Sequence, residues 1–194
     1  MRNWLFHPLI FYPLALAFAV FVIVVSIKPQ AWPRTPAPVT AEVQNGSLLF
    51  RGAAFDSPAV GPEQDFMVVR DFWGRAQTLR IAEKPGNPPP GPDQRGARLL
   101  IDPEQGAMIE GRPVRVDVSY NTIPINMASA LAVSLQGAGP AQWVSQALPE
   151  HAATVRFELP AQTAVSGIAL RALSTNDDQA YGLEITRVRV TPQP

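Results

Sequence analysis

Short runs in which apolar and polar residues alternate cover most of the chain after residue 40. In the run 113–120, three valines alternate with an arginine, an aspartate and a serine. Successive side chains of a β-strand point to opposite faces, so this pattern predicts a strand with one face in a core and the other in water. Comparable runs, separated by turn residues, lie at 47–51, 65–72, 76–82, 97–101, 129–135, 142–148, 153–159, 167–173 and 181–190. Together they predict an all-β domain built as an antiparallel β-sandwich.

Turn residues and one change of phase add detail to this prediction. Asn45-Gly46 is typical of a tight hairpin turn, which also explains the glycosylation-like motif that continues to Ser47. The runs 65–72 and 76–82 meet across Trp73-Gly74-Arg75, which predicts a hairpin with a three-residue loop. In the last run the inward residues change parity near Thr186–Arg187, which predicts a β-bulge. No window of this domain has the period of a helix, so no helix is predicted there.

The start of the chain has a different pattern. Leu5–Ile27 holds no charged side chain, and as a helix its 23 residues would span about 35 Å, enough to cross a hydrocarbon layer of about 30 Å. A cleaved signal peptide needs a shorter apolar region, of about 7–15 residues, and a small-x-small cleavage site. The best candidate sites, at Ala31 and Ala37, are disrupted by neighbouring prolines. The pattern favours a retained single-pass anchor at residues 1–28, with a cleaved signal as the alternative.

Charges near this predicted anchor are almost evenly divided. Arg2 lies on one side of it, and Lys28 and Arg34 lie on the other, so the positive-inside count is nearly balanced. The strand-rich domain that follows suits an exported protein. For a bacterial source we therefore expect the N-terminus in the cytoplasm, the helix in the inner (cytoplasmic) membrane, and the domain in the periplasm or outside the cell.

Small residues on the predicted helix suggest one possible contact. Ala15 and Ala19 form a small-xxx-small pair that would let a second helix approach closely, although alanine is common in such helices. His7 near the membrane edge has the chemistry of a metal or pigment ligand, but a histidine wetted by headgroups is the favoured interpretation. Helix packing at Ala15 and Ala19 therefore stays a prediction about partners.

Two proline-rich segments interrupt the chain. Residues 29–40 hold four prolines and predict an extended, semi-rigid linker between the anchor and a domain at 41–194. The segment 83–96, with five prolines and three glycines, predicts an exposed loop that is neither strand nor helix. Its central Pro88, Pro89 and Pro90 could form a stiff docking arm, and a surface excursion with no partner is an equal alternative.

Charge and composition exclude several functions. Arg2, Lys28 and Arg34 are the three of 16 basic side chains that precede residue 41, whereas all 16 acidic ones follow it, so the domain carries a net charge of −3. Nucleic-acid-binding domains normally carry a basic patch or stripe, so nucleic acid is not expected as a partner. The chain has no cysteine, which excludes disulfides, thiolate metal sites and a thiol nucleophile.

No motif for catalysis or cofactor binding is present. The chain lacks a P-loop, a dinucleotide fingerprint and the common hydrolase and zinc motifs. His151 falls in a turn segment without a serine in a nucleophile context, so a solvated histidine is favoured over a triad member. Calcium ligands could come from Asp177 with Asp178, or from Glu63 with Asp65, but neither pair has the spacing of a known calcium loop. We predict a non-enzyme without cofactor or metal.

The second half of the chain, roughly 106–190, resembles the galactose-binding-like jelly rolls of carbohydrate-binding modules. The residues that carry the resemblance are "VRVDVSY", "LAVSL", "QWVSQALPEHAATVRFELPA" and "GLEITRVRV", in that order. The resemblance implies a jelly-roll-like β-sandwich. It covers less than half of the chain, contains no invariant motif and says little about a ligand.

If the sugar-binding habit of that family applies, exposed aromatic rings should form a stacking platform. The candidate rings are Trp73, Tyr120, Trp143 and Tyr181, and the candidate hydrogen-bonding side chains are Asn121, Asn126 and Asp178. Tyr120 and Trp143 fall on regular strand runs, where a place in the core or at its edge is favoured. Trp73 falls at a hairpin tip and is the ring most expected to be exposed.

Two functions follow from these observations. The favoured one is a non-catalytic accessory or assembly subunit, whose helix inserts beside a larger membrane complex, for example respiratory or photosynthetic, and whose sandwich docks on that complex. The alternative is a membrane-tethered module that binds envelope polysaccharide. The alternative predicts that Trp73, Tyr120 and Trp143 line one exposed face.

Overall fold

The computed structural model of the chain describes residues 7–27, 34–87, 89–176 and 178–194. The chain forms two compact units, residues 1–32 and residues 33–194. The first unit contains a single helix among its described residues, and the second contains two β-sheets and two short helical segments.

The N-terminal unit is built on α1 (Pro8–Ile27), whose 20 residues carry no charge. The amides of Ile10 and Phe11 both donate to the carbonyl of His7 at 2.9 Å, which closes the first turn, and Pro13 is accommodated inside the helix. Pro8–Ser26 has a mean hydropathy of 2.6 and is long and apolar enough to cross a membrane, a description that an anchor and a signal sequence both satisfy. The predicted first residues of the span, Leu5 and Phe6, lie outside the described residues.

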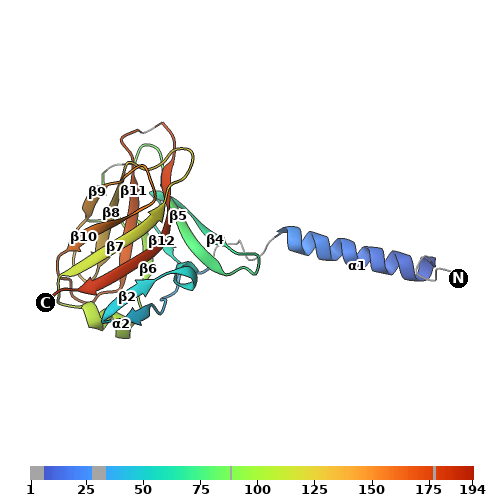
Figure 1. Ribbon diagram of the computed structural model, residues 1–194, viewed down its shortest axis with the longest axis horizontal. Coiled ribbons are helices and arrows are strands. Elements are labelled where there is room, and N and C mark those ends of the chain that lie inside the picture. Colours follow the sequence, from blue (N-terminus) through green and yellow to red (C-terminus); the bar gives the residue numbers. More distant parts are fainter. Residues whose placement is uncertain (1–6, 28–33, 88, 177) are drawn as a thin grey trace. The chain divides into compact units, whose positions relative to one another are not determined.

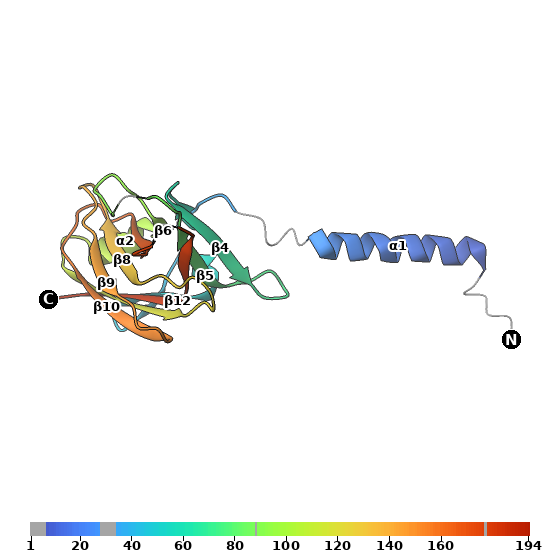
Figure 2. The same cartoon turned by 90° about the horizontal axis from the view of Figure 1, so that it is seen from above.

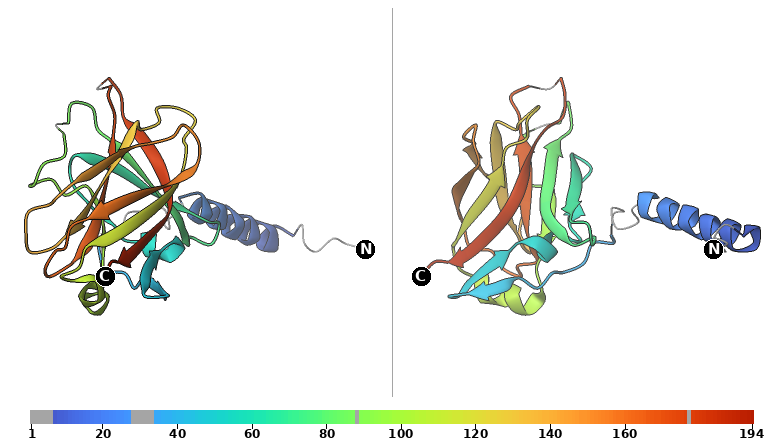
Figure 3. Two further views of the ribbon diagram at one scale, coloured as in Figure 1. Left: turned by 60° about the vertical axis from the view of Figure 1, so that its left-hand side comes forward. Right: turned by 45° about the vertical axis from the view of Figure 1, so that its right-hand side comes forward.

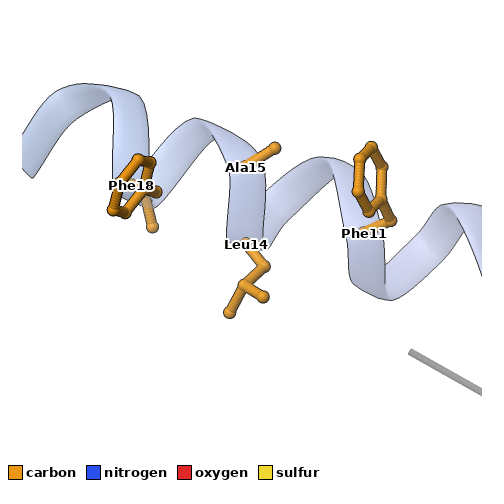
Figure 4. Close-up of a pocket in the computed structure, with 5 residues that line it drawn as sticks. Phe11, Leu14, Ala15 and Phe18 are labelled. Atoms are coloured by element: carbon orange, nitrogen blue, oxygen red, sulfur yellow. The ribbon is translucent and has the colours of Figure 1, made fainter. Parts of the chain in front are cut away.

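Small and large side chains alternate on one face of α1. Ala15 lies between Phe11 and Phe18, and the two rings flank a shallow hollow at the small alanine (Figure 4). The side chains from Pro8 to Ser26 are all exposed within this unit.

The larger sheet of the C-terminal unit has seven strands. They are β1 (Glu42–Gln44), β2 (Ser47–Phe50), β4 (Gln64–Arg70), β5 (Ala76–Glu83), β7 (Val114–Asn121), β10 (Ala153–Leu159) and β12 (Tyr181–Pro192). The long β12 organises the sheet, because its first half pairs with β5, its second half pairs with β2, and β7 follows its other edge. Figure 3 (right) shows β12 running from one end of the sandwich to the other, and β10 continues the sheet beyond β7.

The smaller sheet has five strands in the order β3-β6-β11-β8-β9. They are β3 (Ala59–Val60), β6 (Ala97–Leu100), β8 (Ala130–Gln136), β9 (Val144–Ala147) and β11 (Gly167–Leu173). All strand pairs within the two sheets are antiparallel. The ribbon in Figure 1 shows the two sheets as the layers of a sandwich, which confirms the predicted fold class.

One hydrophobic core fills the space between the sheets. Val114, Val116 and Val118 of β7 are fully buried, as their alternation predicts, and they pack with residues from both sheets. Phe157 of β10 and Leu170 of β11 are also fully buried in this cluster. At about 25 cal/mol per Å² of apolar surface removed from water, such burial is the main force that holds the sheets together.

The local sequence signals are confirmed. Asn45 and Gly46 connect β1 and β2 with φ values of +50° and +74°, as a tight primed turn requires. The register between β12 and β7 shifts between Ile185 and Arg187, where the parity change predicts a bulge. This shift keeps Val188 in the core after the bulge.

Other expectations need correction. The structure contains a helix in the domain, α2 (Pro103–Ile109), where none is predicted, and a 3-10 turn, η3 (Gly52–Phe55). Asp102 caps α2 by accepting a hydrogen bond from the amide of Glu104 at 3.0 Å. Seven residues are too few to show a helical period, so only Asp102, the proline at the first helical position and Glu104 could have signalled it.

Several element ends also differ from the expected ones. β4 ends at Arg70, not at residue 72, β9 covers only Val144–Ala147, and Glu83 belongs to β5 and not to the loop. The proposed boundaries at residues 28 and 40 stay predictions. Part of the proposed linker bonds to the sandwich, because the amide of Val39 donates to the carbonyl of Leu100 at 2.9 Å.

Candidate functional site

The β4–β5 hairpin presents two aromatic rings at its tip. The side chain of Asp71 accepts hydrogen bonds from the amides of Trp73 and Arg75, each at 2.9 Å, and the amide of Asp71 donates to the carbonyl of Arg75 at 2.9 Å. Gly74 has a φ of +78°, which favours glycine. The predicted hairpin is confirmed, with a loop longer than expected, and Figure 2 shows it projecting from the edge of the sandwich.

Phe72 and Trp73 are the two rings at this tip. Their exposed fractions are 81% and 75%, and their ring centroids lie 5.2 Å apart at an interplanar angle of 84°. This edge-to-face geometry is a favoured arrangement of two aromatic rings. Most of the indole surface stays open for contact, as expected for Trp73.

A shallow hollow lies beside the indole. It is lined by Arg34, Gly52, Ala53, Asp56, Trp73, Gly74, Arg75, Ala76 and Gln77. Asp56 follows η3 and forms ion pairs with both Arg34 and Arg70, of which Arg70 is almost fully buried. Its guanidinium also donates to the carbonyl of Gly74 at 3.2 Å, so the wall of the hollow is held to the hairpin.

Two polar side chains of the hairpin face solvent at this hollow. The guanidinium of Arg75 makes no ion pair or hydrogen bond with any residue that the structure describes, and the side chain is exposed. Gln77 donates one amide hydrogen to Asp71 at 3.3 Å, which leaves its carbonyl oxygen as an acceptor. In such an arrangement the indole can stack on the apolar face of a ligand ring, and the polar side chains beside it can hydrogen-bond to the groups at the rim of that ring.

The other predicted aromatic contacts are not at this tip. Tyr120 is only 2% exposed, because it points inward with the valines of β7, and its hydroxyl donates to the carbonyl of Pro149 at 2.8 Å. Burial also raises the pKa of Tyr120. Trp143 is half-buried just before β9, and its indole nitrogen donates to the carbonyl of Gly91 at 3.0 Å. Trp73, Tyr120 and Trp143 therefore do not line one exposed face, and Tyr120 is unavailable as a contact.

A second polar cluster forms at the other end of β5. Tyr181 donates its hydroxyl to Asp178 at 2.9 Å, and Asn126 donates to Gln179 at 2.7 Å. Tyr181 pairs with Glu83, at the end of β5 opposite the hairpin tip. At about 3.3 Å per residue, β5 separates this cluster from Trp73 by about 23 Å, so the predicted polar partners do not serve the Trp73 hollow. Asn121 is exposed at the end of β7, opposite Glu184.

The predicted docking arm is bonded to the sandwich. The carboxylate of Glu63 accepts hydrogen bonds from the amides of Arg95 and Gly96 at 2.9 and 2.6 Å. Burial raises the pKa of Glu63, but these bonds outweigh it and the pKa is lowered. A side chain at Gly61 would overlap the Glu63 carboxylate, so glycine leaves the room that this arrangement needs. Pro89 is exposed, Pro90 is half-buried, and Pro88 lies outside the described residues.

A buried arginine holds the same loop to the outer side of the smaller sheet. Arg171 of β11 is fully buried, and it pairs with Glu83 at 3.2 Å and with the side-chain oxygen of Gln94. Its neighbours Leu170 and Ala172 point into the core, so Arg171 points away from it, toward the loop. Arg171 is not among the residues predicted from the sequence, although a lone arginine within the apolar run "GIALRAL" is a visible signal.

The remaining sequence candidates show no assembled site. Glu63 is committed to backbone amides, and Asp65 lies 3.4 Å from the ammonium of Lys84. Asp177, named with Asp178 as a calcium candidate, lies outside the described residues. Among the residues that the structure describes, no three histidine, aspartate or glutamate side chains gather as a metal site. His151 is exposed in a turn before β10, as expected.

Comparisons with known proteins find similar chains among solved structures alone. No family model matches the chain, and no curated protein matches it. Among solved structures, the CBM22-1 xylan-binding domain of Paenibacillus barcinonensis Xyn10C is 12% identical, with a TM-score of 0.47, over 80% of this chain and 97% of that one. A carbohydrate-binding module of Cellvibrio mixtus lichenase 5A, in complex with cellotriose, is 11% identical, with a TM-score of 0.38, over 75% and 97% of the two chains. Both TM-scores lie below 0.5, so the description of the domain as a β-sandwich rests on its own strand pairing.

Proposed function

We propose that this chain is a non-catalytic, membrane-tethered glycan-binding protein whose sandwich holds a polysaccharide at the Trp73 hollow. The observation that carries the proposal is the 75% exposed indole of Trp73 beside Arg75 and Gln77, which are polar groups with bonding capacity to spare. Trp73 and Phe72 form one exposed apolar patch, and aromatic residues are enriched at contact surfaces.

The chemistry of the hollow suits a sugar. The face of a pyranose ring carries C–H groups that can stack on an indole, and its rim carries hydroxyls that need donors and acceptors. Arg75 supplies donors, and the carbonyl oxygen of Gln77 supplies an acceptor. Asp71 orders the turn, so little conformational entropy is lost when the ligand binds.

The tether in this proposal is α1. Its 19-residue apolar stretch from Pro8 to Ser26 has the length and hydropathy of a single span. We propose that the helix lies in the inner (cytoplasmic) membrane with the N-terminus in the cytoplasm, and that the sandwich is exported. A sandwich held at that surface would retain envelope polysaccharide close to the bilayer.

A second candidate, the accessory subunit of a membrane complex, has one specific observation in its favour. The hollow at Ala15, between the rings of Phe11 and Phe18, has the form that admits a side chain of a neighbouring helix (Figure 4). Its other expected contact, the loop of residues 83–96, has less to offer a partner because Glu63 and Arg171 bind it to the sandwich. Recovery of the full chain in mild detergent as a lone monomer would reject this candidate.

The test of the proposed function uses the full chain in detergent micelles and a panel of glycans. Solved structures of similar fold include modules described as xylan-binding and as bound to cellotriose, so xylo- and cello-oligosaccharides are the first ligands to try. We expect Trp73→Ala to weaken binding at least tenfold, which is about 1.4 kcal/mol. Ile125→Ala is the matched control, because Ile125 is also 75% exposed and lies in the loop between β7 and β8.

Two outcomes would reject the proposal. One is the absence of binding to any glycan of the panel by the unaltered chain. The other is an equal affinity of the unaltered chain and the Trp73→Ala variant.

A further inference from the structure

Four arginines gather on the outer face of three adjacent strands of the larger sheet. They are Arg115 on β7, Arg156 on β10, and Arg187 and Arg189 on β12. The strand register places them around one carboxylate, because Asp117 lies directly opposite Arg156 on β10 and directly opposite Arg189 on β12. Alternation directs these side chains away from the core, since the residues between them are buried apolar ones. We call this surface the arginine face.

Hydrogen bonds order the arginine face. Asp117 accepts from the Nε of Arg156 at 3.1 Å and lies 3.5 Å from the Nε of Arg115. Arg187 donates to the hydroxyl of Ser119 from two nitrogens, at 3.3 and 3.2 Å. The hydroxyls of Ser119 and Thr154 lie 2.8 Å apart, so one donates to the other.

The arginine face is positive within an acidic domain. Residues 41–194 carry a net charge of −3, yet around the four guanidinium groups there are two carboxylates, Asp117 and the exposed Glu158. A third, Glu184, lies further along β12 and pairs with Arg80 of β5. Asp117 contacts Arg115 and Arg156, whereas no ion pair joins Arg187 or Arg189 to a carboxylate of a described residue. The positive charge on the β12 side of the face is therefore uncompensated.

A hollow on this face brings guanidinium groups together with a carboxylate and two hydroxyls. It is lined by Asp117, Ser119, Thr154, Arg156, Arg187 and Arg189. Two residues along a strand span about 6.6 Å, and two strand spacings span about 9.6 Å, so the arginines cover an area that a short polymer segment can contact.

We propose that the arginine face is a second binding site and that its ligand is an acidic polysaccharide. Guanidinium groups bind carboxylate or sulfate oxygens through strong charge-assisted pairs. Asp117 can accept hydrogen bonds from sugar hydroxyls, and the hydroxyls of Ser119 and Thr154 can accept from them or donate to them; a bare oxyanion has no hydroxyls to offer. This mixture of groups therefore fits a ligand that carries both acidic groups and hydroxyls.

Other polyanions fit the face less well. Single-stranded nucleic acid is bound by aromatic rings along a positive groove, and the hollow contains no ring. A duplex is bound by a broadly basic surface, and this domain is acidic overall. The inference does not depend on the Trp73 hollow, because the two surfaces share no lining residue.

The test compares the full chain with the double variant R187Q/R189Q in detergent micelles. Binding of an oligogalacturonate, which is carboxylated, and of a heparin oligosaccharide, which is sulfated, is measured at low and at moderate salt. We expect the unaltered chain to bind at least one of them, and the double variant to bind it at least tenfold more weakly. Raised salt should weaken the binding of the unaltered chain, because the contacts are ionic.

Matched controls separate this site from the Trp73 hollow and from misfolding. Arg51→Gln removes a guanidinium that already pairs with Glu42 on the same sheet, and it should leave acidic-glycan binding unchanged. The variant R187K/R189K keeps both charges and should retain partial affinity if the fold is intact. The double variant R187Q/R189Q should bind the neutral glycan of the Trp73 hollow as tightly as the unaltered chain does, so failure of one proposal is distinguishable from failure of the other.

The proposal is overturned by any of three results. The first is that the unaltered chain binds neither acidic oligosaccharide. The second is that the double variant binds as well as the unaltered chain. The third is that a single-stranded oligonucleotide of equal charge binds the arginine face as tightly as the glycan.

Discussion

Strand β5 carries a loop at each end, and the two loops are built in opposite ways. At its start, the hairpin tip of residues 71–75 is ordered by Asp71 within the tip and exposes Phe72 and Trp73. At its end, the proline-rich loop is bonded to residues distant in sequence, through Glu63 and Arg171. The first loop makes its hydrogen bonds within the tip and leaves its aromatic rings exposed. The second loop makes its hydrogen bonds and ion pairs with residues of the sandwich.

This difference separates surface that is available for binding from surface that is structural. Both loops lie outside the regular strands, and the sequence marks both as candidates for contact. The proline-rich loop covers the outer side of the smaller sheet at Arg171, where a fully buried charge requires partners. Loops that satisfy buried charges should respond to substitution with loss of stability, and loops that only present side chains should not.

The largest expected effect is that of Arg171→Met. Removing one member of a buried ion pair leaves Glu83 uncompensated and should lower the free energy of unfolding by about 3–5 kcal/mol. The measurement is urea unfolding of the full chain in mild detergent, followed by near-UV circular dichroism.

Two further variants give this measurement its contrast. Arg51→Met removes an exposed arginine of a surface pair and should cost no more than about 1 kcal/mol. The double variant R171M/E83Q should be less destabilised than the two single changes together, because it removes both charges. An Arg171→Met variant as stable as the Arg51→Met variant would show that the loop is not fastened as described.

The next effect is expected at Glu63, which joins the start of β4 to the end of the proline-rich loop. Glu63→Ala leaves the buried amide of Gly96 without its acceptor and should cost about 2–3 kcal/mol. The pKa of Glu63 is lowered in the folded state, because the hydrogen bonds from Gly96 and Arg95 outweigh burial. The contribution of the ionised Glu63 to the free energy of unfolding is therefore fully present above the unfolded-state pKa, about 4.3. It is lost as the pH falls through the lower folded-state pKa.

The pH dependence distinguishes the carboxylate from a packing effect. Between pH 7 and about pH 3 the unaltered chain should lose stability more steeply than Glu63→Gln, whose side chain does not titrate. Parallel pH profiles of the two proteins would mean that the charge of Glu63 contributes nothing.

Much of the fold could be predicted because its signals are local. The alternation of Val114, Val116 and Val118 encodes a strand with one buried face, and the parity change near Arg187 encodes a bulge. An Asn-Gly pair selects a primed turn by itself. Each of these signals lies within about ten residues, so no knowledge of the partner strand is needed.

The candidate sites could be predicted only in part. The exposure of Trp73 follows from its place at a hairpin tip, whereas Arg171 meets Glu83 across 88 positions and Gln94 across 77. The arginine face depends on the register of three strands, and alternation does not determine which strands are neighbours. The burial of Tyr120, in contrast, follows from its parity with the valines of β7, and it confirms the favoured place in the core.

A smaller effect is expected at the hairpin tip from Asp71→Ala. The change removes the carboxylate that accepts hydrogen bonds from the amides of Trp73 and Arg75 and from the side chain of Gln77, all at an exposed site. The free energy of unfolding should fall by about 1 kcal/mol, while glycan binding weakens because the tip is no longer ordered. Calorimetric titration with the glycan that binds the unaltered chain measures the change in affinity. Equal affinity in the two proteins would show that the tip needs no ordering by Asp71.

The smallest effect on stability is expected from Trp73→Ala, although its effect on binding should be large. The indole is 75% exposed, and its described ring contact is with Phe72, so its removal should change the free energy of unfolding by less than about 0.5 kcal/mol. A larger loss would place the indole among the structural groups and would remove the distinction between the two loops of β5. A stable variant that no longer binds glycan would instead show that the hairpin tip presents Trp73 to a ligand, while the loop at the other end of the strand secures the sandwich.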